Sequence, residues 1–168
     1  MKREKYVVTS ALPYANGPLH IGHIAGAYLP ADIFVRFCRM QGHDVVYVCG
    51  ADEHGAPISI KAEAEGVTPR EIVDRYHKEI KAGFDGLHIE FDNFSGTARP
   101  DHAKLAQEFF LSLYKRGFVV RKTTEQWFDT EKQRFLADRY VEGTCPHCGA
   151  EGARGDQCDA CGKLIDAV

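Results

Sequence analysis

The apolar positions in the first third of the chain follow two different periods, and together they predict a β-α-β unit. Residues 6–9 form a short apolar run before a loop rich in proline and glycine, as expected for a buried strand. Between residues 21 and 41 the apolar side chains recur at helical spacing, at Ile24, Tyr28, Ile33, Phe34, Phe37 and Met40. Residues 44–49 are nearly all apolar, which is typical of a strand in a parallel sheet covered on both faces.

Pro30 interrupts the helical pattern between these two strands. Proline in a helix interior costs about 3 kcal/mol, whereas the first helical position accepts it. We therefore expect one helix to end near Tyr28 and a second to start at Pro30 and stop at Gly42. The alternation predicts the α/β class, as the first half of a Rossmann-like nucleotide-binding fold, in which ligands bind beyond the carboxyl ends of the strands.

Two longer helices are expected downstream as scaffold. Residues 68–71 spell a capping box with proline at the first helical position, so a helix should run from there toward residue 84. Its buried face is predicted to consist of Ile72, Val73, Tyr76, Ile80 and Phe84. A second helix should start near Pro100 and end at Gly117, with its inward face formed by Leu105, Phe109, Leu113 and Tyr114.

The pattern changes after Gly117. Residues 118–121 and 125–129 look like two strands of a hairpin, which does not continue the α/β alternation. We therefore predict a domain boundary near residue 118. Residues 1–117 would form the Rossmann-like domain, and residues 118–168 a second, smaller domain.

Composition and charge narrow the class of protein. The 168 residues are 44% hydrophobic and 27% charged, ordinary values for a globular domain, and no apolar run approaches the roughly 20 residues of a membrane span. The N-terminus leads into a strand rather than into the apolar core of a signal peptide, so we expect a cytoplasmic protein. With 21 basic and 24 acidic residues the net charge is −3, which predicts no broad basic surface for nucleic acid.

The loop from residue 11 to residue 23 is the strongest candidate for a nucleotide site. It connects a strand to a helix, and the free N–H groups at the start of such a helix stabilise a bound anion. His20 and His23 share one helical face, where two imidazoles can donate hydrogen bonds to a phosphate as its charge develops. Gly22 between them lets a flat base or a sugar approach the backbone closely.

Several sequence blocks resemble one family. Residues 20–23 spell the "HIGH" signature of class I aminoacyl-tRNA synthetases, and the flanking blocks at residues 11–17 and 50–55 resemble the methionyl-tRNA synthetases in particular. The resemblance continues through residues 140–146 to the last cysteine, and so covers nearly the whole chain. It implies that residue 118 begins the connective domain that interrupts the nucleotide fold in this family.

The resemblance also implies roles for individual residues. Asp52 and the backbone of Leu12 would hold the α-ammonium of the amino acid, while Tyr14 would cover its side chain. The ATP site would comprise Asn16, His20, Gly22 and His23, and His20 and His23 would act in catalysis. An ionised aspartate at a strand end suits an ammonium that must be paired on losing water. Asp52 has a competing interpretation as the N-cap of the next helix, and the roles of Glu53 and His54 stay open.

Four cysteines give the strongest signal that rests on spacing alone. Cys145 and Cys148, nine intervening residues, and then Cys158 and Cys161 match a closed tetrahedral zinc site built from two knuckles. Two disulfides are the alternative, which a cytoplasmic setting disfavours. Since four thiolates fill the shell, we predict one structural zinc ion and assign no ligand role to His147.

The function that the resemblance implies is a step of protein biosynthesis: ligation of methionine to its tRNA through an ATP-dependent methionyl-adenylate, with Mg²⁺ expected to accompany ATP. A zinc-knuckle binding module with a vestigial nucleotide fold is one alternative, and a class I synthetase for another amino acid is a second. The lysine-bearing second signature of the family is absent from the 168 residues. We therefore expect an N-terminal fragment that is inactive alone, with the main tRNA contacts elsewhere.

Overall fold

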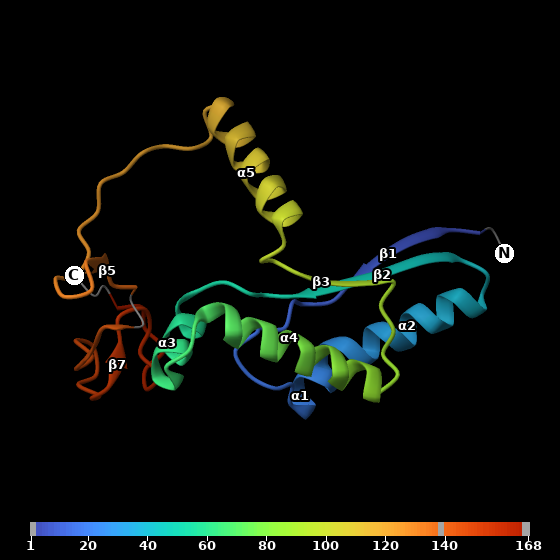
Figure 1. Ribbon diagram of the computed structural model, residues 1–168, viewed down its shortest axis with the longest axis horizontal. Coiled ribbons are helices and arrows are strands. Elements are labelled where there is room, and N and C mark those ends of the chain that lie inside the picture. Colours follow the sequence, from blue (N-terminus) through green and yellow to red (C-terminus); the bar gives the residue numbers. More distant parts are fainter. Residues whose placement is uncertain (1–2, 138–139, 166–168) are drawn as a thin grey trace. The chain divides into compact units, whose positions relative to one another are not determined.

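The computed structural model describes residues 3–137 and 140–165, so both ends of the chain lie outside the described residues. Two compact units are present, Met1–Ser112 and Leu113–Val168. The first is an α/β unit, which confirms the predicted fold class (Figure 1). None of the helices among the described residues is long and apolar enough to cross a membrane.

A three-stranded parallel sheet forms the centre of the first unit. Its strands are β1 (Lys5–Thr9), β2 (Asp44–Ala51) and β3 (Asn93–Gly96), in the order β1-β2-β3. Val7 pairs with Val46, and Cys49 pairs with Phe94, so the carboxyl ends of the three strands lie at one edge of the sheet. This edge is where a ligand is expected in an open α/β sheet.

The helices are α1 (Ile21–His23), the π-helical turn η1 (Ile24–Tyr28), α2 (Leu29–Met40), α3 (Ala56–Glu65), α4 (Pro69–Gly86) and α5 (Pro100–Lys115). The predicted helical regions are helical, and α3 is a further helix between β2 and α4. Helices α2 and α4 lie along the same side of the sheet (Figure 1). Their inner faces and the inward side chains of β2 form one apolar core, to which Val35, Tyr47, Ile72, Ile80 and Phe84 contribute buried side chains.

Helix α4 matches its prediction in full. Thr68 is its N-cap, the Thr68 and Glu71 side chains form the reciprocal capping box, and Pro69 occupies the first turn. All five side chains of the predicted inner face are buried. The amphipathic period and the cap are both local signals, and neither depends on the packing partner.

The helix after the loop does not break at Pro30, contrary to the sequence-based prediction. Residues 21–40 are helical throughout, and the chain widens to a π-helical turn immediately before the proline, with the Leu29 N–H bonded to the Ile24 carbonyl. Pro30 has no N–H and its ring crowds the carbonyl four residues earlier, so a wide turn relieves the crowding without ending the helix.

Two predicted apolar faces are solvent-exposed in the described chain. On α2 the buried positions are Asp32, Val35 and Cys38, while the exposed apolar ones are Ile33, Phe34, Phe37 and Met40. Asp32 is accommodated inside because Arg36 and the Glu90 N–H both donate to its carboxylate. Helix α5 buries none of its residues, so the prediction that Leu105, Phe109, Leu113 and Tyr114 form an inward face is wrong for this chain.

The sheet is covered on one face only in the described chain, whereas the strand composition predicted cover on both. Val45 and Tyr47 point into the core, while Val46 is 44% exposed and Val7 is 75% exposed. The alternate side chains of β1 and β2 therefore form an open apolar surface.

The second unit contains two short hairpins. Strands β4 (Phe128–Asp129) and β5 (Arg134–Phe135) pair antiparallel, as do β6 (Glu142–Gly143) and β7 (Ala153–Arg154). The hairpin predicted from residues 118–121 and 125–129 is wrong, because residues 118–127 form no strand. The turn comes later, where the Asp129 carboxylate accepts from the N–H groups of Glu131 and Lys132.

Candidate functional site

The loop after β1 and the end of β2 lie side by side. Tyr14 and Asp52 form an isolated parallel bridge, in which the Asp52 N–H donates to the Pro13 carbonyl and the Ala15 N–H donates to the Asp52 carbonyl, both at 2.8 Å. Ala15 is fully buried. Backbone pairing therefore places the candidate amino-acid residues Tyr14 and Asp52 at one point of the sheet edge.

Tyrosine hydroxyls hold this loop at two places. The buried Tyr28 donates to the Ala11 carbonyl at 2.9 Å, and burial raises the pKa of Tyr28 to about 12, so the hydroxyl stays protonated as a donor. Tyr14 donates to the His54 carbonyl at 2.5 Å. The loop is thereby fastened both to the helix after it and to the turn that follows β2.

His20 and His23 cap each other at the helix start. The His23 N–H donates to the Nδ1 atom of His20, and the His20 N–H donates to the Nδ1 atom of His23, each at 3.3 Å. Their rings are stacked with centroids 3.6 Å apart. Since each Nδ1 accepts a hydrogen bond, the proton of each neutral imidazole lies on Nε2. Two exposed Nε2–H donors are thus presented together.

The structure explains why residue 22 is a glycine in a way that the sequence did not reveal. A Cβ atom at this position would lie 3.1 Å from both Cε1 and Nδ1 of the His20 ring. A side chain here would push against the capping imidazole, so glycine at residue 22 keeps His20 in place. Asn16 is fastened by its backbone, since its carbonyl accepts from the Lys61 ammonium at 2.9 Å.

Asp52 is not a helix cap, and this removes the competing interpretation of that residue. The N-cap of α3 is Gly55, with a φ of 116° and no side-chain hydrogen bond. The Asp52 side chain is partly exposed, and in the described part of the chain no hydrogen bond or ion pair to its carboxylate is found. Leu12, the other residue expected at the ammonium, is 53% exposed.

A cavity of about 910 Å³ opens at the carboxyl ends of the three strands. Its lining includes Ser10, Leu12, Cys49, Thr97 and Arg99. Of the residues proposed from sequence, Leu12 alone lines it; the histidine pair and Asp52 lie outside the cavity lining. Burial raises the pKa of the Cys49 thiol, which makes it a poor nucleophile at neutral pH.

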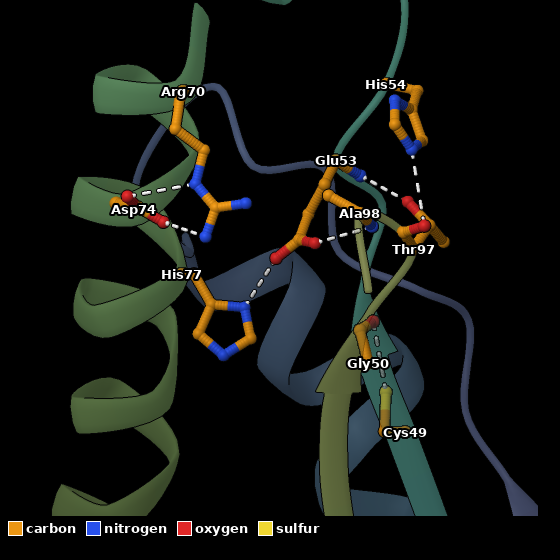
Figure 2. Close-up of polar contacts among 9 residues, drawn as sticks. All are labelled: Cys49, Gly50, Glu53, His54, Arg70, Asp74, His77, Thr97 and Ala98. Atoms are coloured by element: carbon orange, nitrogen blue, oxygen red, sulfur yellow. Dashed lines mark hydrogen bonds and ion pairs between the residues drawn. The ribbon is translucent and has the colours of Figure 1, made fainter. Parts of the chain in front are cut away.

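Sequence reasoning missed a buried polar cluster beside this edge (Figure 2). Glu53, whose side chain is 7% exposed, accepts from the His77 imidazole at 2.7 Å and from the Ala98 N–H at 2.8 Å. The Glu53 N–H donates to the Thr97 hydroxyl at 2.9 Å. The sequence gives only a weak signal for it, because the partners are 24 and 45 residues away from Glu53.

The four cysteines of the second unit converge. Their Sγ atoms all lie within 4.8 Å of one another, with Cys145 and Cys161 at 3.9 Å and Cys148 and Cys158 at 3.7 Å. A sulfur–sulfur bond is about 2.05 Å long, so these thiols are unpaired and disulfides are excluded in this arrangement. The group can hold a metal ion.

Backbone N–H groups point at this cluster. Burial opposes ionisation of the Cys145 thiol, but hydrogen bonds from the N–H groups of His147 and Cys148, together with those from the Cys148 and Cys158 thiols, outweigh it and lower the pKa of Cys145 to about 6. Gly149 and Gly162, after the second cysteine of each pair, adopt φ of 75° and 70°. The His147 ring contacts the Leu164 carbonyl at 3.1 Å and contributes no atom to the cluster.

Comparisons with known proteins show the family of the chain. A family model described as tRNA synthetases class I (M) matches residues 6–168. The methionine–tRNA ligase of Pyrococcus abyssi is 58% identical over 96% of the chain, and that of Rubrobacter xylanophilus is 57% identical over 99%. The chain spans only 22% and 29% of these two relatives, and so about a quarter of their length.

Solved structures give the same result for the fold. The Mycobacterium tuberculosis methionyl-tRNA synthetase in complex with methionyl-adenylate superposes with a TM-score of 0.74 at 26% identity, over 96% of this chain and 30% of that one. The LeuRS–tRNA–LeuAMS ternary complex from Agrobacterium radiobacter K84 gives 0.70 at 27% identity, over 92% and 20%.

Proposed function

We propose that this chain, which belongs to the class I tRNA synthetases (M), supplies the first half of the site in which methionine reacts with ATP. The full-length polypeptide would be a methionine–tRNA ligase, as its relatives at 54–58% identity are named. The observation that carries the proposal is the stacked histidine pair at the start of the helix after β1, whose two Nε2–H donors are exposed. The end of β2 adds the Asp52 carboxylate, which has no partner among the described residues.

The histidine pair would serve ATP. Activation of an amino acid forms a bond between its carboxylate oxygen and the α-phosphorus, and breaks the bond from that phosphorus to the pyrophosphate oxygen. No proton needs to move, so the catalytic demand is for positioning and for stabilising negative charge. His20 and His23 would donate from Nε2 to phosphate oxygens. Their Nδ1 atoms are already occupied by the backbone, so the donors need no reorientation during the reaction.

Asp52 would hold the amino acid. Its carboxylate has no partner among the described residues, and backbone pairing fixes it beside Tyr14. The α-ammonium of the substrate would donate a charge-assisted hydrogen bond to this carboxylate. The Leu12 carbonyl could accept a second hydrogen bond from the same ammonium. Tyr14 would cover the substrate side chain, and Asn16 and Gly22 would lie along ATP.

Mg²⁺ would bind together with ATP, as a metal ion separate from the one expected at the four cysteines. Apart from the four cysteines, no group of three or more potential metal ligands lies together in the described part of the chain. Mg²⁺ would therefore be held mainly by the phosphates of ATP, as is common for this ion.

The four-cysteine cluster would bind structural zinc. A tetrahedron with Zn–S bonds of about 2.3 Å has sulfur–sulfur edges of about 3.8 Å, and two of the Sγ pairs lie at 3.7 and 3.9 Å. The donor set and the spacing thus fit zinc. All four positions are taken by thiolates, so such an ion would stabilise the second unit without activating water.

The partners would be methionine, ATP and tRNA, in the cytoplasm. A net charge of −3 supports the expectation that the main tRNA contacts lie outside this chain. A zinc-knuckle binding module with a vestigial nucleotide fold is the competing function, but such a module has no need for two preorganised Nε2–H donors or for a carboxylate without a partner among the described residues.

Amino-acid-dependent exchange of labelled pyrophosphate into ATP tests the proposal in the full-length polypeptide that contains this chain. Methionine should support exchange, whereas leucine, isoleucine, valine and cysteine should not. Exchange driven best by one of the other four would reassign the substrate. Binding of ATP without exchange for any amino acid would favour the binding module.

A further inference from the structure

The buried carboxylate of Glu53 connects three parts of the fold that meet beside the candidate site. It accepts from His77 on α4 through Oε1 and from the Ala98 N–H, between β3 and α5, through Oε2. The Glu53 N–H donates to the Thr97 hydroxyl, and His54 contacts the Thr97 carbonyl at 3.2 Å. The turn after β2 is thereby joined both to α4 and to the segment after β3 (Figure 2).

The surrounding backbone is shaped to admit this carboxylate. A Cβ atom at Gly96 would lie 2.2 Å from the carboxyl carbon and from both oxygens of Glu53. Gly96 is the last residue of β3, and its φ lies outside the left-handed region. Glycine at residue 96 is therefore explained by the space that Glu53 takes, and not by backbone conformation.

The groups around Glu53 are arranged to stabilise its single carboxylate. His77 is its only ionisable hydrogen-bond partner among the described residues, and the His77 ring lies against Phe94 with centroids 5.2 Å apart. Arg70 lies nearer the start of α4 than His77 does (Figure 2). Its guanidinium is bonded to the Asp74 carboxylate, at 2.9 and 3.0 Å, and not to Glu53. A buried carboxylate with two directed donors is costly to disturb, because loss of either donor leaves buried charge uncompensated.

Fixing Glu53 also fixes its neighbours on the chain. Successive side chains of an extended segment point to opposite sides, so the inward direction of Glu53 keeps the Asp52 carboxylate directed to the other side. On the other flank, the His54 carbonyl accepts from the Tyr14 hydroxyl at 2.5 Å. Both of the side chains that would contact the amino acid thus depend on the placement of the segment that Glu53 holds.

We propose that Glu53 and His77 are positioning residues for the amino-acid half of the site, which they serve by holding Asp52 and Tyr14 in register without touching substrate. This inference rests on the proposed function. It makes a specific distinction: disturbing the pair should impair use of the amino acid and leave use of ATP intact, because the histidine pair is held by its own reciprocal caps.

The experiment uses the full-length polypeptide and steady-state methionine-dependent pyrophosphate exchange, with KM determined separately for methionine and for ATP. His77→Ala removes the donor to Glu53, whereas His77→Asn places an amide N–H near the position of Nδ1. His77→Ala should raise the KM for methionine about ten- to hundredfold, with the KM for ATP within about twofold of wild type. His77→Asn should restore most of the loss. Asp85→Asn on the exposed end of α4 is the matched control and should change neither constant.

Glu53→Gln supplies a second test that does not depend on His77 alone. Its amide oxygen can accept from the Ala98 N–H, and its NH₂ group can donate to a His77 ring whose other tautomer leaves Nδ1 unprotonated. The KM for methionine should therefore rise less than in His77→Ala. The fraction of active enzyme is measured by active-site titration in every variant.

Equal loss of kcat with both KM values unchanged would mean that the pair only keeps the fold, and would overturn the inference. Failure of His77→Asn to improve on His77→Ala in the KM for methionine would overturn it as well. Both results differ from failure of the proposed function, in which wild-type protein itself shows no methionine-dependent exchange.

Discussion

His20 and His23 each accept a hydrogen bond at Nδ1 from the backbone N–H of the other, with their ring centroids 3.6 Å apart. The arrangement separates two functions within each imidazole. Nδ1 stabilises the start of the helix, and we propose that Nε2–H donates to a phosphate. The two functions can be removed one at a time, because the amide of asparagine reaches the position of Nδ1 and that of glutamine the position of Nε2.

The first prediction uses this separation. In the full-length polypeptide, His23→Asn should keep the cap and lose the phosphate donor, so the rate of adenylate formation should fall by about 10²–10³, as for loss of one preorganised donor. Its melting temperature and methionine affinity should stay near wild type. Single-turnover kinetics with labelled ATP measure the rate. A His23→Asn variant that forms adenylate at the wild-type rate would show that Nε2 has no part in the reaction.

The second prediction concerns pH and the capping box of α4. Hydrogen bonds from the Thr68 N–H and hydroxyl lower the pKa of Glu71 below its ordinary 4.5. A carboxyl group with a depressed folded pKa stabilises the fold fully above the unfolded pKa and loses this effect as pH falls through the folded value. Glu71→Gln should therefore weaken amide-exchange protection in the first turn of α4 at pH 7, and the difference from wild type should shrink below about pH 4.5. A difference that grows on acidification would contradict this assignment.

The third prediction concerns the four-cysteine cluster. Natively purified, reduced chain should contain one zinc ion, and Cys145→Ser or removal by a chelator should unfold mainly residues 113–165, because metal binding here stabilises folding. Amide exchange of α2 and α4 should change little, since they belong to the other compact unit. Elemental analysis that finds no metal in such protein would refute the zinc site.

The fourth prediction tests the close contact between Gly96 and Glu53. Gly96→Ala places a methyl group on the Glu53 carboxylate and should lower stability by about 1–3 kcal/mol, as for other overpacked sites. In a Glu53→Ala background the same substitution should cost clearly less. Denaturant unfolding of the four proteins of this double-mutant cycle measures the coupling. Equal cost in both backgrounds would mean that Gly96 is required for a reason other than Glu53.

How far the sequence predicts this molecule depends on the range of each signal. Helix α4 was predicted in full, because its cap and its apolar period lie within the helix itself. Of the site residues that were tied to motifs, Tyr14 and Asp52 meet at one edge of the sheet because parallel strands must end together. By contrast, the β4–β5 hairpin was misplaced, since its turn has neither glycine nor proline and depends on the Asp129 side chain and a left-handed Gln133, with a φ of 50°.

The Glu53–His77 pair shows the other limit. His77 lies at the border of the buried face of α4, and nothing in its local sequence distinguishes it from a surface histidine. The Glu53–His77 contact joins residues 24 apart in the sequence, and the other two partners of Glu53 reach it because β3 pairs with β2 and brings residues 97 and 98 beside the turn that contains Glu53. The exposure of the apolar faces of α2 and α5 could not be predicted for the same reason, because whether an apolar face is covered depends on elements far away in sequence.

The central claim is that this chain supplies one half of a methionine-activating site, and methionine-dependent exchange of labelled pyrophosphate into ATP tests it most directly. The 168-residue chain alone should show no exchange above the level of its His23→Ala variant, because the lysine-bearing second signature is absent from the sequence. The full-length polypeptide should exchange readily. Exchange by the chain alone, clearly above the His23→Ala background, would contradict the account by showing that residues 1–168 already contain a complete active site.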